Sequence, residues 1–383
     1  MLRVLTLSTL FPDASRPNFG VFVERQTLGL SREPDTQVTV IAPVGLPPWP
    51  LRRAAHRALA ALPAREMWQG LEVHRPRFLA LPGMGGRWHA PLLARALIRL
   101  LDTLRFDVID ASFFFPDGPA AVVLGRRYGV PVSIKARGAD IHHWGHASAT
   151  AAQVRAAGRG ADGLLAVSDA MRDDMAALGL PAERIRVHRT GIDHHRFRIQ
   201  DRAAAKAARG LAGPVVLSLG ALIPRKGHGI VVDAVAPLAG VTLLIAGEGP
   251  ERAALAAQIQ RLGLADRVRL LGSVPHAELP ALIAAADVMA LASSSEGLAN
   301  AWVEALACGT PVVIPDAGGA REVVNAPAAG LVVAREPAAF TAAIRALLHA
   351  PRDPAATAAA AAPFSWDRNA RELRAHLAGL VRG

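Results

Sequence analysis

Two glutamates stand close together in the stretch SSSEGLANAWVEALACGTPVV, residues 293–313, with seven residues between Glu296 and Glu304. An apolar strand-like run precedes Glu296 and a helical run holds Glu304, which places one acid in a loop and the other in a helix. Gly297 keeps the loop slim, so the amides of the helix start can approach an anion or sugar hydroxyls. The two carboxylates are suited to different parts of one elongated ligand. The competing interpretation is a helix-capping acid and a surface glutamate.

A second chemical cluster is the stretch GALIPRKG, residues 220–227, which lies between an apolar run and a helical run. Arg225 and Lys226 therefore occupy a strand-to-helix turn. Two cations at the start of a helix favour an anionic ligand such as a diphosphate. A solvated basic turn is the alternative, because Arg-Lys pairs are common at surfaces.

The elements that must position these groups are short β-branched runs, each followed by a helical stretch. Continuous apolar strands that alternate with helices are typical of parallel sheets covered on both faces. The pattern predicts an α/β protein with two doubly wound domains. The runs begin at residues 3, 37, 107, 131, 163 and 185 in the first half and at residues 214, 241, 267, 287, 311 and 330 in the second.

The polar, basic segment 195–213 interrupts this alternation and marks the expected domain boundary. We expect an N-terminal domain over residues 1–195, a C-terminal domain over 196–363 and an amphipathic helix over 364–383. Ligands of doubly wound sheets bind at the carboxyl ends of the strands. Two such domains that face each other form a cleft, where the chemistry is expected.

The second half resembles the C-terminal domain of the family-4 retaining glycosyltransferases, the glycosyl transferases group 1. The likeness runs from GALIPRKG through LLIAGEGPERAAL and the stretch with Glu296 and Glu304 to GLVV. The first half is similar to the same family through STLFPDASRPNFGVFVERQ, ARGAD and TGIDHHRF. The resemblance implies the GT-B fold, in which two Rossmann-like domains face across a cleft and the last helix packs back on the N-terminal domain.

The resemblance also assigns roles to particular residues. Arg225 and Lys226 would hold the diphosphate of a nucleotide sugar, Glu304 the ribose and Glu296 the donor sugar, so that Glu296, Lys226 and Arg225 form the catalytic set. Further donor contacts would come from Gly20, Val274, Gly297, Leu298, Ala299 and Asn300. Arg137 stands where many members have a histidine that touches the sugar, so Arg137 or Asp140 would take that role. Ala221 replaces an arginine of many members.

The expected activity is transfer of a sugar, with retention, from a UDP- or GDP-sugar to a saccharide, a lipid-linked intermediate of cell-surface polysaccharide synthesis. No cofactor and no metal are expected, because the sequence has no paired-aspartate motif. One alternative is a GT-B nucleotide-sugar epimerase, which would need acid–base residues beside the sugar and would turn over without acceptor. The other is a non-catalytic nucleotide-sugar-binding protein. The pattern leaves base, sugar, linkage, acceptor and oligomeric state open.

Composition narrows the partners. Lys+Arg total 43 against 32 Asp+Glu, a formal charge of +11, which favours anionic partners. Ten arginines lie between residues 52 and 105 among Trp68, Trp88 and leucines, which indicates either an anionic membrane surface or an ordinary solvated helix face. No nucleic-acid motif is present. The single cysteine, Cys308, fits a reducing cytoplasm, and no apolar run reaches the roughly 18 residues of a membrane span. We expect a cytoplasmic protein, peripheral on the inner face of the cell membrane.

Overall fold

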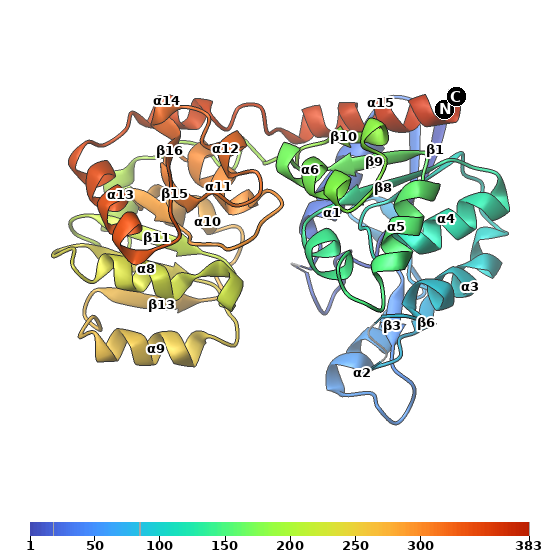
Figure 1. Cartoon of the computed structure of the whole chain (residues 1–383), viewed down its shortest axis with the longest axis horizontal. Coiled ribbons are helices and arrows are strands. Elements are labelled where there is room, and N and C mark those ends of the chain that lie inside the picture. The colour runs from blue at the N-terminus through green and yellow to red at the C-terminus, as the bar shows by residue number, and fades with distance from the viewer. Residues whose placement is uncertain (18, 84–85, 383) are drawn as a thin grey trace. The chain divides into compact units, whose positions relative to one another are not determined.

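The chain is divided into two compact units. The computed structural model describes residues 1–17, 19–83 and 86–382. Unit 1 comprises residues 1–191 together with the C-terminal helix α15 (Trp366–Arg382), and unit 2 comprises Ile192–Ser365. Each unit has its own sheet with helices packed on it (Figure 1). Among the described residues, no helix combines the length and apolar character needed to cross a bilayer.

Unit 1 is built on an eight-stranded sheet in the order β10-β9-β8-β7-β1-β2-β5-β4. All neighbouring strands in it run parallel except β4, which pairs antiparallel with β5. The six apolar runs that the sequence predicts in this half all lie on strands. The bounds are β1 (Leu2–Leu7), β2 (Thr36–Ile41), β4 (Arg65–Trp68), β5 (Leu71–His74), β7 (Val108–Ala111), β8 (Val132–Ala136), β9 (Gly163–Ala166) and β10 (Ile185–Val187).

The helices of unit 1 cover this sheet, and the C-terminal helix completes its core. Leu373 and Leu377 of α15 are buried with Val4, Leu30 and Val108 of the N-terminal residues. Apart from the large sheet, β3 (Val44–Leu46) and β6 (Arg77–Leu79) form a two-stranded sheet beside α2 (Ala54–Ala61). The other helical elements are α1 (Val21–Ser31), α3 (His89–Leu101), α4 (Asp117–Tyr128), a π-helical turn (Asp140–Trp144), α5 (Ala151–Gly160), α6 (Asp169–Ala177) and a 3₁₀ turn (Ala182–Arg184).

Unit 2 contains a six-stranded parallel sheet in the order β13-β12-β11-β14-β15-β16. The six apolar runs predicted in this half are its strands. Their bounds are β11 (Val215–Leu219), β12 (Thr242–Ala246), β13 (Val268–Gly272), β14 (Val288–Ala290), β15 (Val312–Pro315) and β16 (Gly330–Val333). The helices are α7 (Arg202–Ala207), α8 (His228–Val235), α9 (Arg252–Arg261), α10 (Leu279–Ala284), α11 (Asn300–Ala307), α12 (Ala320–Val323), α13 (Pro337–His349) and α14 (Pro354–Ala359), with 3₁₀ turns at Pro224–Lys226 and Pro327–Ala329.

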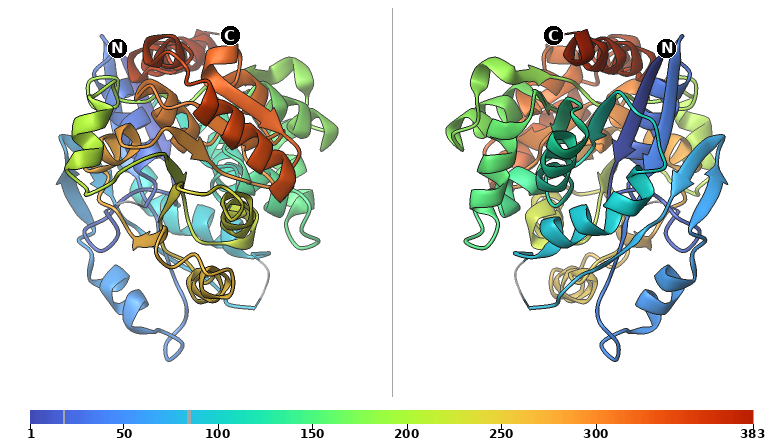
Figure 2. Two further views of the ribbon diagram at one scale, coloured as in Figure 1. Left: turned by 90° about the vertical axis from the view of Figure 1, so that its left-hand side faces the viewer. Right: turned by 90° about the vertical axis from the view of Figure 1, so that its right-hand side faces the viewer.

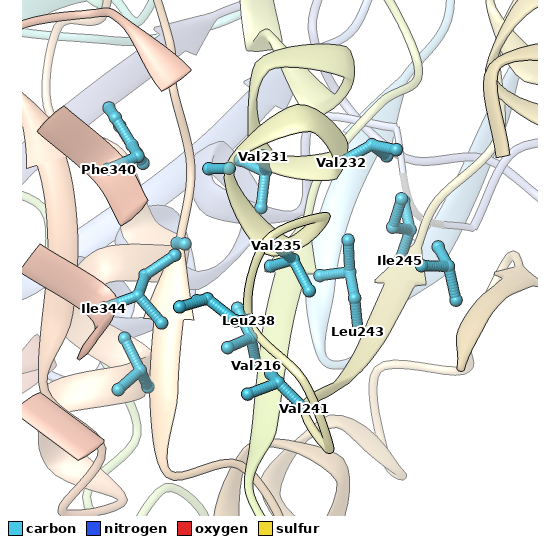
Figure 3. Packing of buried hydrophobic residues seen from close by; sticks show 14 of the residues in the cluster. Val216, Val231, Val232, Val235, Leu238, Val241, Leu243, Ile245, Phe340 and Ile344 are labelled. Atoms are coloured by element: carbon cyan, nitrogen blue, oxygen red, sulfur yellow. The ribbon is translucent and has the colours of Figure 1, made fainter. Parts of the chain in front are cut away.

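The core of unit 2 explains why α8 and the strands are rich in valine, isoleucine and leucine. Figure 3 shows α8 presenting Val231 and Val235 toward strand residues such as Leu243, with Phe340 and Ile344 of α13 beside them. All five side chains are fully buried. Burying one such side chain contributes about 1.5–3 kcal/mol, so this packing fixes the frame from which the loops at the strand ends project.

Both sheets have a switch point, where the strand order reverses direction. In unit 2, β11 lies between β12 and β14, and in unit 1, β1 lies between β2 and β7. The loops that leave the carboxyl ends of two strands on either side of such a point diverge and leave a crevice for ligands. Ligand contacts are therefore expected at the loops after β11 and β14 and at those after β1 and β7.

Candidate functional site

The loop after β11 carries the two cations predicted to hold an anion. Arg225 and Lys226 lie in the 3₁₀ turn that leads into α8. Gly227 ends this turn at φ +65°, and a Cβ there would lie 2.2 Å from the carbonyl oxygen of Ala292. The turn is therefore packed directly against the segment that follows β14. Only glycine permits both this left-handed conformation and this close approach.

Glu296, in the loop after β14, pairs with both cations. Lys226 Nζ lies 2.5 Å from Glu296 Oε1, and Arg225 Nη1 lies 3.2 Å from Oε2. Arg225 also donates a hydrogen bond to the carbonyl of Ser295. Burial raises the pKa of the Glu296 carboxyl, but Lys226 and Arg225 lower it more, and the pKa lies below its usual range. The cluster is thus ionised, with two positive charges against one negative charge.

The start of α11 lies directly after this cluster. Gly297, Leu298 and Ala299 are buried, and Asn300 is the first helical residue. Ala299 occupies the N-cap position, and no side chain caps the helix. The amides of an uncapped first turn carry partial positive charge and can bind an anion. The Oδ1 atom of Asn300 is buried and makes no hydrogen bond in the structure.

Gly318 and Gly319, in the loop after β15, pack against the loop that carries Glu296. Gly319 N donates to the carbonyl of Gly297 at 2.9 Å. A Cβ at Gly318, where φ is +53°, would lie 2.0 Å from the carbonyl oxygen of Glu296. The sequence PDAGGAR after β15 could have revealed this support, since paired glycines after a strand mark a close backbone approach.

Glu304 is buried one helical turn further along α11 and meets a histidine that the sequence analysis did not single out. His276 Nε2 lies 3.3 Å from Glu304 Oε1. The His276 ring also packs edge-on against buried Phe197, with centroids 5.3 Å apart. Val274, in the same loop after β13, is half-buried. The structure therefore brings Arg225 and Lys226 together with Glu296, and groups Glu304 with the loop of Val274.

Three predicted residues belong to unit 1. Gly20 caps the start of α1 at φ +71°, and a Cβ there would lie 2.4 Å from the carbonyl oxygen of Leu10, so the loop after β1 folds tightly on itself. Asp140 is fully buried, and its carboxylate accepts hydrogen bonds from the amides of Phe114, Arg137 and Gly138 at 2.7–3.1 Å. In this structure Asp140 holds the loop after β8 in place.

Arg137 is half-buried at the end of β8 and is part of a basic cluster. Its guanidinium donates to the carbonyl of Ser112 at 2.6 Å and to Gln26 Oε1 at 3.1 Å. Burial lowers the pKa of Arg137 to about 10, which still leaves it charged at neutral pH. Lys135 Nζ donates to the same Gln26 oxygen at 2.8 Å. Gln26, which the sequence analysis quoted only within a motif, thus joins the two basic side chains.

The cluster extends to the C-terminal helix through His188. The Nε2 atom of His188 lies 2.8 Å from the carbonyl oxygen of Asn369, so Nε2 must carry the proton. Nδ1 is then the acceptor for Lys135 Nζ, 2.9 Å away. Burial lowers the pKa of Lys135 well below its ordinary value, and burial also lowers the pKa of His188. These residues lie at the carboxyl ends of β8 and β10, and α15 closes the cluster.

Unit 2 has the properties of a phosphate-binding domain. Two cations and an uncapped helix start lie on loops that flank the switch point of a doubly wound sheet, which is where such sheets bind nucleotides. Residues 200–363 match the family model described as glycosyl transferases group 1, and residues 21–196 match that of glycosyltransferase family 4. The chain belongs to the family-4 glycosyltransferases and has the GT-B fold.

Individual relatives agree with this assignment. The putative teichuronic acid biosynthesis glycosyltransferase TuaC of Bacillus subtilis strain 168 is 26% identical over 332 residues, which cover 83% of this chain and 82% of the relative. The D-inositol 3-phosphate glycosyltransferase of Mycobacterium avium strain 104 is 37% identical over 213 residues, 52% of this chain and 50% of the relative. The chain is thus aligned with about half the length of that second relative.

Solved structures share the fold over nearly the whole chain. Anabaena HepE in complex with UDP has a TM-score of 0.76 at 23% identity. The match covers 99% of this chain and 100% of the HepE chain. Sucrose-phosphate synthase from Thermosynechococcus elongatus has a TM-score of 0.83 at 20% identity, with 99% of both chains covered.

Proposed function

We propose that this glycosyltransferase moves a sugar, with retention of anomeric configuration, from a UDP- or GDP-sugar to a saccharide acceptor. We propose that the acceptor is a lipid-linked intermediate of cell-surface polysaccharide synthesis and that the enzyme acts at the cytoplasmic face of the membrane. The observation that carries the proposal is the pairing of Lys226 and Arg225 with Glu296 at the switch point of unit 2. HepE, which shares the fold, is described with UDP and with UDP-glucose, and TuaC is named for polysaccharide synthesis.

The proposed chemistry follows from where charge develops. As the bond between the anomeric carbon and the diphosphate breaks, the departing phosphate oxygen gains negative charge. Arg225, Lys226 and the first amides of α11 are held in place to stabilise that charge. The acceptor oxygen bonds to the anomeric carbon, and its proton passes to the departing phosphate oxygen on the same face. Glu296, between the two cations, is the group we assign to the donor sugar.

Glu304 is assigned to the nucleoside. Its carboxylate is buried, and His276 Nε2 lies 3.3 Å from its Oε1 atom. A buried carboxylate in a helix beside the Val274 loop is suited to accept hydrogen bonds from the vicinal hydroxyls of a ribose. In unit 1, Arg137 is assigned to the acceptor or sugar side, held by Gln26 and the Ser112 carbonyl.

The test combines binding with turnover. A panel of UDP-, GDP- and ADP-sugars is screened by thermal shift, since a ligand that binds only the folded state raises its apparent stability. The stabilising donor is then incubated with and without lipid-linked saccharide, and the anomeric configuration of the product is read by NMR. Sugar transfer with retention is expected. Epimerised donor without acceptor supports the epimerase, and binding without any turnover supports the non-catalytic alternative.

A further inference from the structure

Residues 44–62 form a separate projection of unit 1, which we name the α2 lobe. It consists of β3, the loop 47–53, α2 and Leu62. Val44, Leu46 and Leu62 form a small core of their own with Leu59 and Ala60. In Figures 1 and 2 the lobe projects at the end of unit 1 opposite α15. It is a folded element that extends away from the large sheet.

The lobe is fastened to the rest of unit 1 by Arg77 on β6. The Arg77 guanidinium donates hydrogen bonds to the carbonyls of Arg75, at 2.6 Å, and of Ala60 and Leu62 at the end of α2. The β3–β6 pairing adds main-chain bonds. This support leaves the far side of the lobe, the loop 47–53 and α2, in a defined conformation.

The far side exposes large apolar groups. Trp49 is 82% exposed and Leu51 57% exposed, and no residue of α2 is buried. Both side chains lie in the proline-rich loop PPWPL, whose prolines restrict the backbone. A tryptophan and a leucine exposed two residues apart on one projecting loop mark an interaction site.

The charged side chains of the lobe are all basic. Residues 44–65 contain Arg52, Arg53, Arg57 and Arg65 together with His56, and no aspartate or glutamate. Arg65 pairs with Glu72 at 2.9 Å, whereas within the described ranges no ion pair joins Arg52, Arg53 or Arg57 to an acid. Arg53, at the N-cap position of α2, and Arg57, in its first turn, are exposed. The complementary surface must therefore be anionic.

The size of the apolar tip selects the kind of partner. A stable protein–protein interface buries about 800 Å² on each partner, far more than two side chains supply. Insertion into a bilayer interface needs only a few side chains, because tryptophan and leucine enter the headgroup region while arginines bind the phosphates. We propose that the α2 lobe docks on an anionic lipid bilayer, with Trp49 and Leu51 inserted and Arg52, Arg53 and Arg57 on the headgroups.

The lobe is a smaller surface than the arginine-rich region 52–105 predicted from the sequence. Arg75 is buried, where it pairs with Glu66, and Arg77 serves main-chain carbonyls. Trp68 donates to Glu24 and packs on the core of unit 1.

The inference rests on the proposed function only for its purpose, since a lipid-linked acceptor lies at a membrane. The binding itself depends on the lobe alone.

Vesicle flotation tests the docking. Vesicles of phosphatidylcholine with phosphatidylglycerol, and of phosphatidylcholine alone, are compared at low and high salt. Wild type is expected to float with anionic vesicles at low salt. Trp49→Ser with Leu51→Ser should lower partitioning on the order of tenfold, and Arg53→Gln with Arg57→Gln about thirtyfold at low salt. Val381→Ser with Arg371→Gln, two exposed positions on α15, is the matched control and should float as wild type does.

A label at the tip tests insertion directly. Cys308, the one cysteine of the chain, is buried, and burial raises the pKa of its thiol to about 12. Leu51→Cys can therefore be labelled selectively with an environment-sensitive dye. Its emission should shift to the blue on anionic vesicles, whereas dye on Val381→Cys should not respond.

Wild type that fails to float, or lobe variants that float normally with an unshifted dye, would overturn the docking proposal. Nucleotide affinity, measured by calorimetry without lipid, separates the two proposals. Lobe variants should bind the stabilising nucleotide as wild type does. If no nucleotide binds while the vesicle results hold, the proposed function fails and the docking surface stands.

Discussion

Lys226 Nζ lies 2.5 Å from Glu296 Oε1, so a group assigned to the leaving diphosphate is already bound to the group assigned to the sugar. Arg225 reaches the other oxygen of the same carboxylate at 3.2 Å. Glu296 is only 8% exposed, so its carboxylate is largely out of water, whereas the Arg225 side chain is 43% exposed. The acid therefore orients both cations before any ligand arrives, and a diphosphate must share them with it.

Glu296→Gln is expected to separate nucleotide binding from transfer. The variant removes the anion that competes for Lys226 and Arg225, so affinity for the bare nucleoside diphosphate should not fall. Transfer should fall, because the sugar loses its carboxylate partner. Calorimetry with UDP and GDP, together with transfer assays, measures both. Normal transfer by Glu296→Gln would contradict the role assigned to this residue.

Lys226→Ala is expected to harm both steps. A charge-assisted hydrogen bond contributes about 1.5–3 kcal/mol, so nucleotide affinity should fall about ten- to a hundredfold, and transfer more, since charge grows on the diphosphate as the bond breaks. Lys206→Ala is the matched control. Lys206 also pairs with a carboxylate, that of Asp287, at 2.6 Å. Asp287 precedes β14, however, whereas Glu296 follows it. Equal loss of affinity in both variants would show that the effect is structural.

A pair of glycine variants tests the packing of the Lys226 turn. Gly227 and Gly263 have nearly the same left-handed backbone, φ +65° and +66°, but a Cβ at Gly263 would meet nothing within 4 Å. Gly263→Ala should cost about 1–2 kcal/mol of unfolding free energy from backbone strain alone. Gly227→Ala should cost more and also weaken nucleotide binding, because the turn must move away from Ala292. Urea denaturation and calorimetry provide the comparison, and equal losses in both would contradict it.

The C-terminal helix should make stability depend on pH through His376. Burial lowers its pKa to about 4, helped by nearby Arg186 and Lys135, whereas the ordinary histidine pKa of about 6.5 applies to the unfolded chain. Between these values the unfolded chain binds the proton and the folded chain does not, so stability falls as pH falls from about 6.5 toward 4. This contribution amounts to about 2 kcal/mol between pH 7 and pH 5.

His376→Gln removes this titrating group. The unfolding free energy of the variant relative to wild type should therefore rise by about 2 kcal/mol as the pH falls from 7 to 5. The variant can keep a hydrogen bond to Ser133, whose hydroxyl lies 3.0 Å from His376 Nε2. His349→Gln, at an exposed position on α13, is the control. Urea denaturation at the two pH values measures the difference, and a difference that does not change with pH would refute this role of His376.

The main sheets were predictable because their strands are continuous apolar runs. The small sheet was not predicted, since β3 and β6 are three residues each. The edge strands β4 (REMW) and β5 (LEVH) of the large sheet were not predicted either, because they mix charged and apolar residues. The α2 lobe was not predicted either, because it is built on the short strand β3. Its exposed Trp49 and Leu51 look like core residues in a sequence, and only burial shows otherwise.

The candidate site, too, was predictable from the sequence only in part. Arg225, Lys226 and Glu296 could be named from motifs, but their mutual pairing comes from the adjacency of β11 and β14, which are far apart in sequence. His276 could not be assigned to Glu304 without the fold, since the two lie 28 positions apart on different elements. His188 joins Lys135 for the same reason, because parallel strands bring distant carboxyl ends together, and Gln26 reaches Lys135 from helix α1.

Transfer is expected to need no divalent metal. Arg225 and Lys226 supply two positive charges at the place assigned to the diphosphate, and the α11 amides add partial charge. Activity should therefore be unchanged after treatment with EDTA, and added magnesium or manganese should change it little. Activity that disappears with chelator and returns with either metal would overturn this expectation.

Glu304→Gln tests whether the two glutamates serve one elongated donor. The variant keeps the shape of the side chain and its neighbour His276, but it loses a charge-assisted hydrogen bond to the ribose. Such a bond is worth about 1.5–3 kcal/mol, so affinity for the nucleoside diphosphate should fall about ten- to a hundredfold. Glu336→Gln, an exposed acid at the start of α13, is the control and should bind normally. The contrast with Glu296→Gln decides the assignment, because that variant should lose transfer and keep the nucleotide. If Glu304→Gln binds its nucleotide as wild type does, Glu304 is a packed helix acid and the ribose must be held elsewhere.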